Sequence, residues 1–139
     1  MNPVRLHATT VAIGGHGVMI VGPSGSGKSD LALRLIDRGA VLVSDDYTAF
    51  SARDGMVIAT APATIAGRIE LRGVGIVETP HSTEIPVMMV VRLGAAVERM
   101  PEPCSEWVAD IAIPAIALAG FEASAPIKVE IALSRLVRG

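Results

Sequence analysis

Aromatic residues are scarce in this sequence: they make up 3% of its 139 residues, whereas apolar residues of all kinds make up 50%. A buried core must therefore be built from Val, Ile, Leu, Ala and Met side chains. Cysteine is also scarce, since Cys104 is the only one. A lone cysteine excludes an internal disulfide framework and is typical of a protein from a reducing cytosol.

Long hydrophobic runs are missing as well. Arg, Glu, Gly and Pro interrupt every apolar stretch before it reaches the roughly 18 residues that a membrane-spanning helix needs. The residues from Met1 to His7 lack the charged-then-apolar order of a signal peptide. We therefore expect a cytoplasmic protein with no membrane partner. The length of 139 residues suits a single domain, over residues 1–139.

An excess of charge of one sign is missing too, because the formal net charge is −2 and the pI is near 5.9. These values exclude the broad basic surface of a nucleic-acid-binding protein, so we expect no nucleic-acid partner. Lysine is rare among the basic residues: Lys28 and Lys128 stand beside ten arginines. A sequence that prefers arginine keeps lysine where a compact charge must sit over phosphates.

A glycine-rich loop surrounds the first of these lysines. The segment Gly-Pro-Ser-Gly-Ser-Gly-Lys-Ser over residues 22–29 matches the P-loop pattern G-x-x-x-x-G-K-[ST]. Its glycines allow a tight turn whose N–H groups face phosphate oxygens, and the helix that follows adds its positive end. We assign phosphate binding to Gly22, Pro23, Ser24, Gly25, Ser26, Gly27, Lys28 and Ser29, with ATP and Mg²⁺ as the expected ligands. We expect Lys28 to be an exposed loop residue whose replacement leaves the fold intact.

The hydrophobic pattern predicts an α/β fold with a mixed sheet of considerable antiparallel content. A helix is expected from Lys28 to Arg38, with Leu31, Ala32, Leu33, Leu35 and Ile36 as its apolar stripe and Gly39 as its cap. A terminal helix should follow Ser124, its possible N-cap, and is indicated by the apolar residues Ile127, Ile131, Leu133 and Leu136. Strands are expected at Thr9–Ile13, Val18–Val21, Val41–Val43, Tyr47–Ser51, Met56–Thr60 and Pro86–Val91, and a loop at Glu98–Glu106.

Paired carboxylates follow the strand after the first predicted helix. Asp45 and Asp46 should lie at the carboxyl end of that strand, within reach of the bound phosphates. Adjacent residues on an extended chain point in different directions, so one carboxylate can accept a proton while the other addresses Mg²⁺ or a backbone turn. The alternative is a solvated loop with an Asx-turn. Downstream, Glu70 and Arg72 stand two residues apart, which suits either a metal and phosphate site or a surface ion pair.

Three segments together resemble the HPr kinase/phosphorylase family. The glycine loop, followed by the acidic Asp30, is similar to the loop of that family, which usually carries Glu there. The segments 35–39 and 42–46 resemble the family's helix end and double-aspartate strand. Residues 70–76 resemble its signature of Glu, apolar, Arg, Gly, apolar, Gly, Ile. The resemblance covers residues 7–77, in a short form that lacks the family's N-terminal domain.

This resemblance implies the P-loop core fold shared with phosphoenolpyruvate carboxykinase, commonly assembled into hexamers, so we expect a homo-oligomer. It implies ATP-dependent phosphorylation of a seryl hydroxyl on HPr or a related phosphocarrier protein. It also implies phosphorolysis, in which inorganic phosphate attacks the phosphoserine and yields pyrophosphate.

The resemblance also implies roles for single residues. Asp45 takes the proton of the serine hydroxyl, and Asp46 assists in positioning a metal or a proton. His7 stands at the family's distance before the loop and would lie beside Asp45 to tune its protonation. Ser29 and Glu70 would hold Mg²⁺.

Arginines complete the expected site. By the resemblance, Arg72 neutralises charge near the phosphates, and a mobile loop supplies another arginine. Arg99 is our choice for that role, with Arg92 as the alternative. The stretch over residues 113–120 stands where longer members of the family have a further arginine and carries none.

Two other functions are open at this level. One is a small-molecule P-loop kinase, although such enzymes usually carry an arginine-rich lid that this sequence lacks. The other is a nucleotide-dependent sensor or binding module without turnover.

Overall fold

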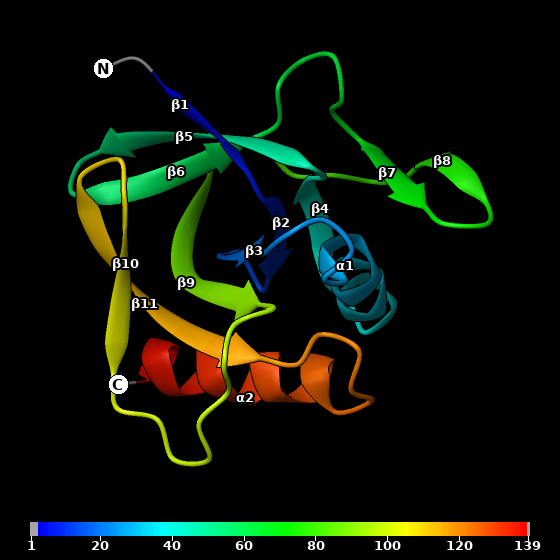
Figure 1. The fold of residues 1–139 in the computed structure, drawn as a ribbon. Helices are drawn as coiled ribbons and strands as arrows, with labels where there is room; N and C mark the ends of the chain where they lie inside the picture. The colour runs from blue at the N-terminus through cyan, green and yellow to red at the C-terminus, as the bar shows by residue number, and fades with distance from the viewer. Residues whose placement is uncertain (1–2, 139) are drawn as a thin grey trace.

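The computed structural model describes residues 3–138, which form eleven strands and two helices (Figure 1). The strands are β1 (Val4–His7), β2 (Thr9–Ile13), β3 (His16–Val21), β4 (Val41–Ser44), β5 (Tyr47–Arg53), β6 (Met56–Thr60), β7 (Arg68–Leu71), β8 (Gly75–Glu78), β9 (Ile85–Leu93), β10 (Cys104–Val108) and β11 (Ile111–Leu118). The helices are α1 (Lys28–Asp37) and α2 (Ala125–Arg138). Within the described range, neither helix is long and apolar enough to cross a membrane.

Strand β9 belongs to two sheets. Its first residues pair antiparallel with β6 and continue the series β1-β5-β6, while its later residues pair in parallel with β3 on one side and β11 on the other. Because β2 runs antiparallel to both β3 and β4, the strands β4, β3, β9 and β11 all point the same way. The loops that follow these four strands therefore meet at one edge of the sheet, where ligands bind in α/β proteins. The predicted mixed α/β fold is confirmed.

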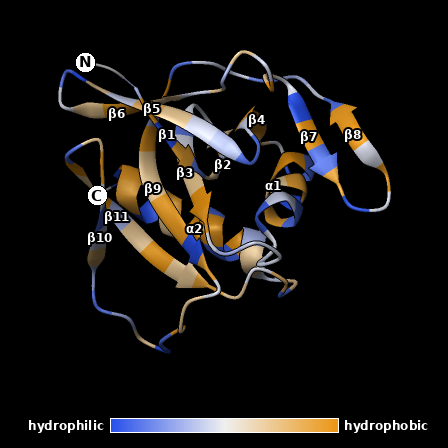
Figure 2. Ribbon diagram, turned by 45° about the horizontal axis from the view of Figure 1, so that its top comes forward, coloured by the Kyte–Doolittle hydropathy of each residue, from blue (hydrophilic) through white to orange (hydrophobic). Residues whose placement is uncertain are grey.

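Hydrophobic residues fill two layers, one on each side of the central strands, and β3 and β9 are coloured mainly as hydrophobic in Figure 2. On one side, Leu35 of α1 and Val129 of α2 pack against Ile20 of β3. On the other side, Met19 of β3 meets Phe50 of β5. The aliphatic core expected from the composition is therefore present, with Phe50 as its largest fully buried side chain.

The predicted terminal helix is present as α2, and of its four predicted apolar positions only Leu133 is buried. Ile127 and Ile131 are 42% and 56% exposed, and the buried positions on α2 include Val129 and Leu133. The helix contacts β9, and its buried face consists of Ala125, Pro126, Val129 and Leu133. On α1, the prediction was correct for most of the stripe and wrong for Leu33, which is exposed.

Several strands were not predicted. The predicted loop at residues 98–106 ends earlier, because β10 already begins at Cys104. Its partner β11 has Pro114 in its interior, which argues against a strand by propensity. Here Pro114 lies just before the pairing with β9 begins, so no hydrogen bond to β9 is lost. The short strands β1, β7 and β8 are mostly exposed and carry little apolar pattern.

Two glycines support the glycine loop from the ends of β9 and β11. A Cβ on Gly94 would meet the Pro23 ring at 2.9 Å, and a Cβ on Gly120 would meet the Ser26 carbonyl oxygen at 2.9 Å. The chain after each strand therefore lies in direct contact with the loop, and any side chain at these positions would push it away.

We predict that Gly120→Ala lowers the free energy of unfolding by about 1–3 kcal/mol, because the new methyl group overlaps the Ser26 carbonyl and the Leu93 side chain. Urea unfolding followed by circular dichroism measures this change. The neighbouring exposed Ala119→Ser is the control and should stay within about 0.5 kcal/mol of the wild type. Equal stability of the two variants would contradict the close packing described here.

Candidate active site

The glycine loop joins β3 to the first turn of α1 at the shared edge of the parallel strands. Gly25 and Gly27 have φ angles of 82° and 100°, in the left-handed region that only glycine adopts readily. Gly27 is the N-cap of α1 and supplies no side-chain hydrogen bond to the helix. The first N–H groups of the helix are thus uncapped by a side chain, which is the arrangement that binds anions.

Lys28 closes the mouth of this loop. Its Nζ donates to the carbonyl oxygens of Gly22 at 2.8 Å and Pro23 at 3.1 Å, and the residue is 8% exposed. The expectation that Lys28 is exposed was wrong. The two carbonyl groups hold its ammonium group against the loop, and the side chain is therefore buried. Beneath the loop, the Ser26 hydroxyl is buried and finds no partner among the described residues.

Asp45 accepts hydrogen bonds from three separate elements. Its Oδ1 accepts from the Ser29 hydroxyl at 2.7 Å and the Thr9 hydroxyl at 3.1 Å, and its Oδ2 accepts from the Glu70 backbone N–H at 3.0 Å. The residue is 5% exposed. A buried carboxylate needs such partners, because each donor offsets part of the cost of removing its charge from water.

Asp46 lies in a strained turn that aims its side chain elsewhere. Its φ is 69°, and the Tyr47 N–H donates to the Asp45 carbonyl at 2.8 Å, which closes a three-residue γ-turn around it. Its Oδ1 lies 2.8 Å from His7 Nε2, and its backbone N–H donates to the Thr9 hydroxyl at 3.2 Å. Such strain is most often found at functional sites.

The structure therefore corrects the predicted partner of His7. We expected His7 beside Asp45, and it pairs instead with Asp46, because the γ-turn rotates the second carboxylate toward β1. The two carboxylates have different hydrogen-bond partners: Asp45 bonds to Ser29, and Asp46 bonds to His7. Thr9, which contacts both of them, was missed: in the sequence it is only another β-branched residue at the start of a strand.

Of the remaining predicted residues, only Glu70 contacts this centre. The backbone of Glu70 reaches Asp45, while its side chain is exposed. Arg72 is exposed in the turn between β7 and β8, and Arg99 is exposed in the loop after β9. Arg92 is tied to Glu106 through both carboxylate oxygens, and this hydrogen bond raises the pKa of its guanidinium group.

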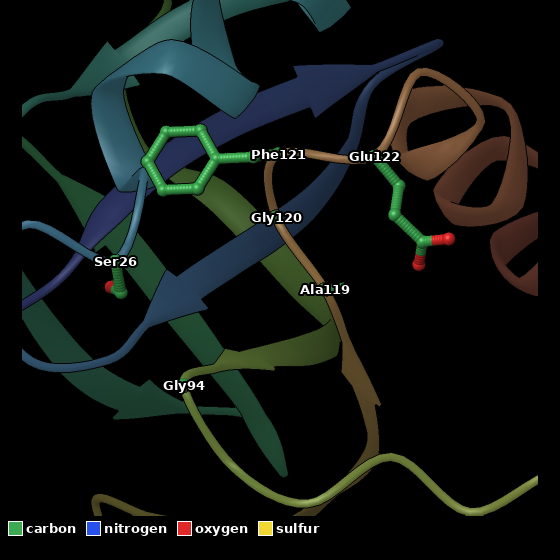
Figure 3. Close-up of a pocket in the computed structure, with 6 residues that line it drawn as sticks. All are labelled: Ser26, Gly94, Ala119, Gly120, Phe121 and Glu122. Atoms are coloured by element: carbon green, nitrogen blue, oxygen red, sulfur yellow. The ribbon is translucent and has the colours of Figure 1, made fainter.

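A hollow lies on the other side of the glycine loop, at the ends of β9 and β11 (Figure 3). It is lined by Ser26, Gly94, Ala119, Gly120, Phe121 and Glu122. Sequence reasoning did not single out Phe121, because one aromatic residue in a short loop carries no pattern.

This chain is similar to known proteins. The profile of the family described as HPr Serine kinase C-terminal domain matches residues 2–85. An HPr kinase/phosphorylase of Clostridium botulinum is 43% identical over 74 residues, which are 53% of this chain and 24% of the relative. One from Clostridium beijerinckii is 45% identical over 74 residues, with the same shares. The chain thus spans about a quarter of the length of these curated relatives.

The likeness in structure continues past residue 85. The solved structure of the HPr(Ser) kinase/phosphatase from Coxiella burnetii matches this chain with a TM-score of 0.81 at 28% sequence identity. The match covers 97% of this chain and 96% of that one. A profile match over more than half of the sequence and a common fold lead to one conclusion: this chain belongs to the family of HPr serine kinase C-terminal domains.

Proposed function

We propose that residues 1–139 form one catalytic domain, an ATP-dependent serine kinase that phosphorylates an HPr-like phosphocarrier protein. One observation carries this proposal: the Ser29 hydroxyl of the glycine loop bonds to buried Asp45 at 2.7 Å, and the Asp46–His7 pair lies directly beside it. Phosphoryl transfer needs a phosphate cradle, charge neutralisation and a group that receives the hydroxyl proton. These residues supply all three at one edge of the sheet.

Mg²⁺ fits the oxygen atoms around Ser29. Among residues 3–138, no three His, Cys, Asp or Glu side chains gather to hold a metal by themselves. Mg²⁺ is usually bound by one or two carboxylates together with substrate phosphates, so Ser29 and Asp45 are sufficient protein ligands. The exposed side chain of Glu70, next to its bonded backbone, is the proposed additional ligand. When bound, the ion neutralises charge on the phosphates.

We assign proton transfer to Asp46 and metal positioning to Asp45, which reverses the roles that the resemblance implied. Both oxygens of Asp45 already accept hydrogen bonds from the protein. Asp46 keeps a side chain that is 64% exposed and is oriented by His7, so a seryl hydroxyl has access to it. In the reverse direction, an oxygen of inorganic phosphate attacks the phosphoserine phosphorus, pyrophosphate forms, and the serine oxygen takes back its proton.

Charge and position support the remaining roles. Arg72 and Arg99, both exposed on loops, are proposed to reach the phosphates or the carrier's phosphoserine when the carrier is bound. The exposed free thiol of Cys104 is typical of a protein that works in the cytoplasm.

We predict that Asp46→Asn lowers kcat by about 10²-fold or more, because the amide cannot take a proton. Its Mg²⁺ dependence should be unchanged. Asp45→Asn should instead raise the Mg²⁺ concentration needed for half-maximal rate. Transfer of radiolabelled γ-phosphate from ATP to a purified HPr-like carrier, titrated with Mg²⁺, measures both effects. The control is Asp54→Asn in the exposed β5–β6 turn, which should behave as the wild type. A full rate in both variants would contradict these roles, and ATP binding without any transfer by the wild type would support a binding module without turnover.

Lys28→Met should abolish transfer while ATP binding weakens at least tenfold, because the compact charge over the phosphates is lost. Methionine keeps the buried stem, so the melting temperature should change little. Activity assays, equilibrium binding and thermal melts on one preparation separate these effects. Persistent transfer to the carrier would show that the glycine loop is not the phosphate site. If phosphate were transferred only to small molecules, the acceptor would be a small molecule and not a carrier protein.

A homo-oligomer, a hexamer by family resemblance, is proposed for the chain. Ile131 on the outer face of α2 and Trp107 on β10 are 56% and 74% exposed, and assembly would cover such apolar groups. Multi-angle light scattering should give a mass that is a multiple of 14.4 kDa, and Ile131→Lys should reduce that multiple. A wild-type mass of 14.4 kDa at all protein concentrations would refute assembly.

A further inference from the structure

Phe121 is an exposed aromatic residue in direct contact with the glycine loop. Its side chain is 68% exposed, although it is one of only two phenylalanines and the other, Phe50, is fully buried. Its ring carbons lie 3.0 Å from the position that a Cβ on Gly27 would take. Figure 3 shows the ring extending from the loop after β11 toward the start of α1. The protein thus presents a large flat apolar surface to solvent next to its phosphate cradle.

The loop that carries Phe121 is fixed in place. The guanidinium group of Arg34 on α1 donates to the carbonyl oxygens of Glu122, at 2.9 Å, and Gly120. Asp30 holds the same guanidinium group at 3.0 Å, and Gly120 itself packs against the Ser26 carbonyl. Three bonded or packed contacts to α1 and the glycine loop therefore position the ring, so its exposure is not the result of a loose segment.

Phe121 and Asp45 lie on opposite sides of the cradle. Across the sheet the strands run β11, β9, β3, β2, β4; Phe121 follows β11, Asp45 follows β4, and the glycine loop follows β3 between them. Because Ser29 bonds to Asp45, these two residues would hold the terminal phosphates and their metal on the β4 side. A nucleotide bound that way extends its ribose and base toward the β11 side, where the hollow of about 500 Å³ beside Phe121 is open.

We infer that Phe121 is the stacking platform for the base of the bound nucleotide, and that the hollow beside it is the base subsite. This inference rests on the proposed nucleotide-dependent function. The Glu122 side chain points away from the ring in Figure 3 and pairs with Lys128 at 3.7 Å. The nearby carbonyls of Gly120 and Glu122 are engaged by Arg34. Stacking without a polar reader accepts any base, so adenine and guanine nucleotides should bind with similar affinity.

Calorimetric titration of the full chain with Mg²⁺–ATP and with Mg²⁺–tripolyphosphate tests the subsite. Phe121→Ala should weaken ATP binding by roughly 5- to 150-fold, the range for losing one base–aromatic stack, and leave tripolyphosphate binding unchanged. Phe121→Tyr should retain ATP affinity. Met56→Ala, which removes an exposed apolar side chain from β6, is the control and should change the affinity for neither ligand.

Four outcomes would overturn the inference. Unchanged ATP affinity in Phe121→Ala would exclude stacking. An equal loss for both ligands would show that Phe121 only supports the shape of the loop. Equal wild-type affinity for ATP and tripolyphosphate would show that the base makes no contact, while leaving the phosphate site intact. Failure of the wild type to bind either ligand would instead refute the phosphate site itself and the subsite with it.

Discussion

The carboxylate of Asp45 is the contact around which the site is assembled. It stands at the end of β4 and receives donors from β2, from α1 and from β7, three elements that are otherwise separate in the chain. A buried negative charge is tolerated only when its oxygens are bonded, so the carboxylate and its donors specify one another. Through Ser29 it also ties the end of β4 to the first turn of α1, next to the glycine loop.

The strand topology explains how a few residues from distant parts of the chain form the candidate site. The parallel direction of β4, β3, β9 and β11 delivers one carboxylate, one phosphate cradle, one supporting glycine and one aromatic ring to the same edge. These groups are far apart in the sequence, and only the residues of the glycine loop are neighbours along the chain. The rigid sheet, rather than local chain geometry, sets the spacing between the chemical groups.

Sequence patterns predicted what depends on neighbours along the chain. The glycine loop, helix α1, the strands flanking it and the two carboxylates follow from spacing within ten or so residues. The partner of His7 could not be predicted in this way. That contact joins residues 39 apart and depends on a backbone turn with positive φ at a non-glycine residue.

Long-range packing also decided the predictions that failed. The apolar residues of α2 did not reveal its buried face, because both faces carry apolar residues. Only the contact with β9 explains why Val129 is buried and Ile131 is exposed. Strand β11 went unrecognised because its alanines and its proline carry little strand preference, and the neighbouring β9 and β10 hold it in place. Phe121 could be recognised as a candidate binding residue only from the structure, where its ring lies against Gly27.

The shared strand β9 has a consequence for biosynthesis. The strand that leads into the glycine loop has its parallel neighbour only at residues 87–92, far along the chain. While a ribosome is still making the N-terminal half, β3 has one side unpaired and the two sheets have no common member. The native cradle thus cannot be completed before β9 has left the exit tunnel. Until then, the nascent chain exposes an apolar strand edge that chaperones or premature partners can bind.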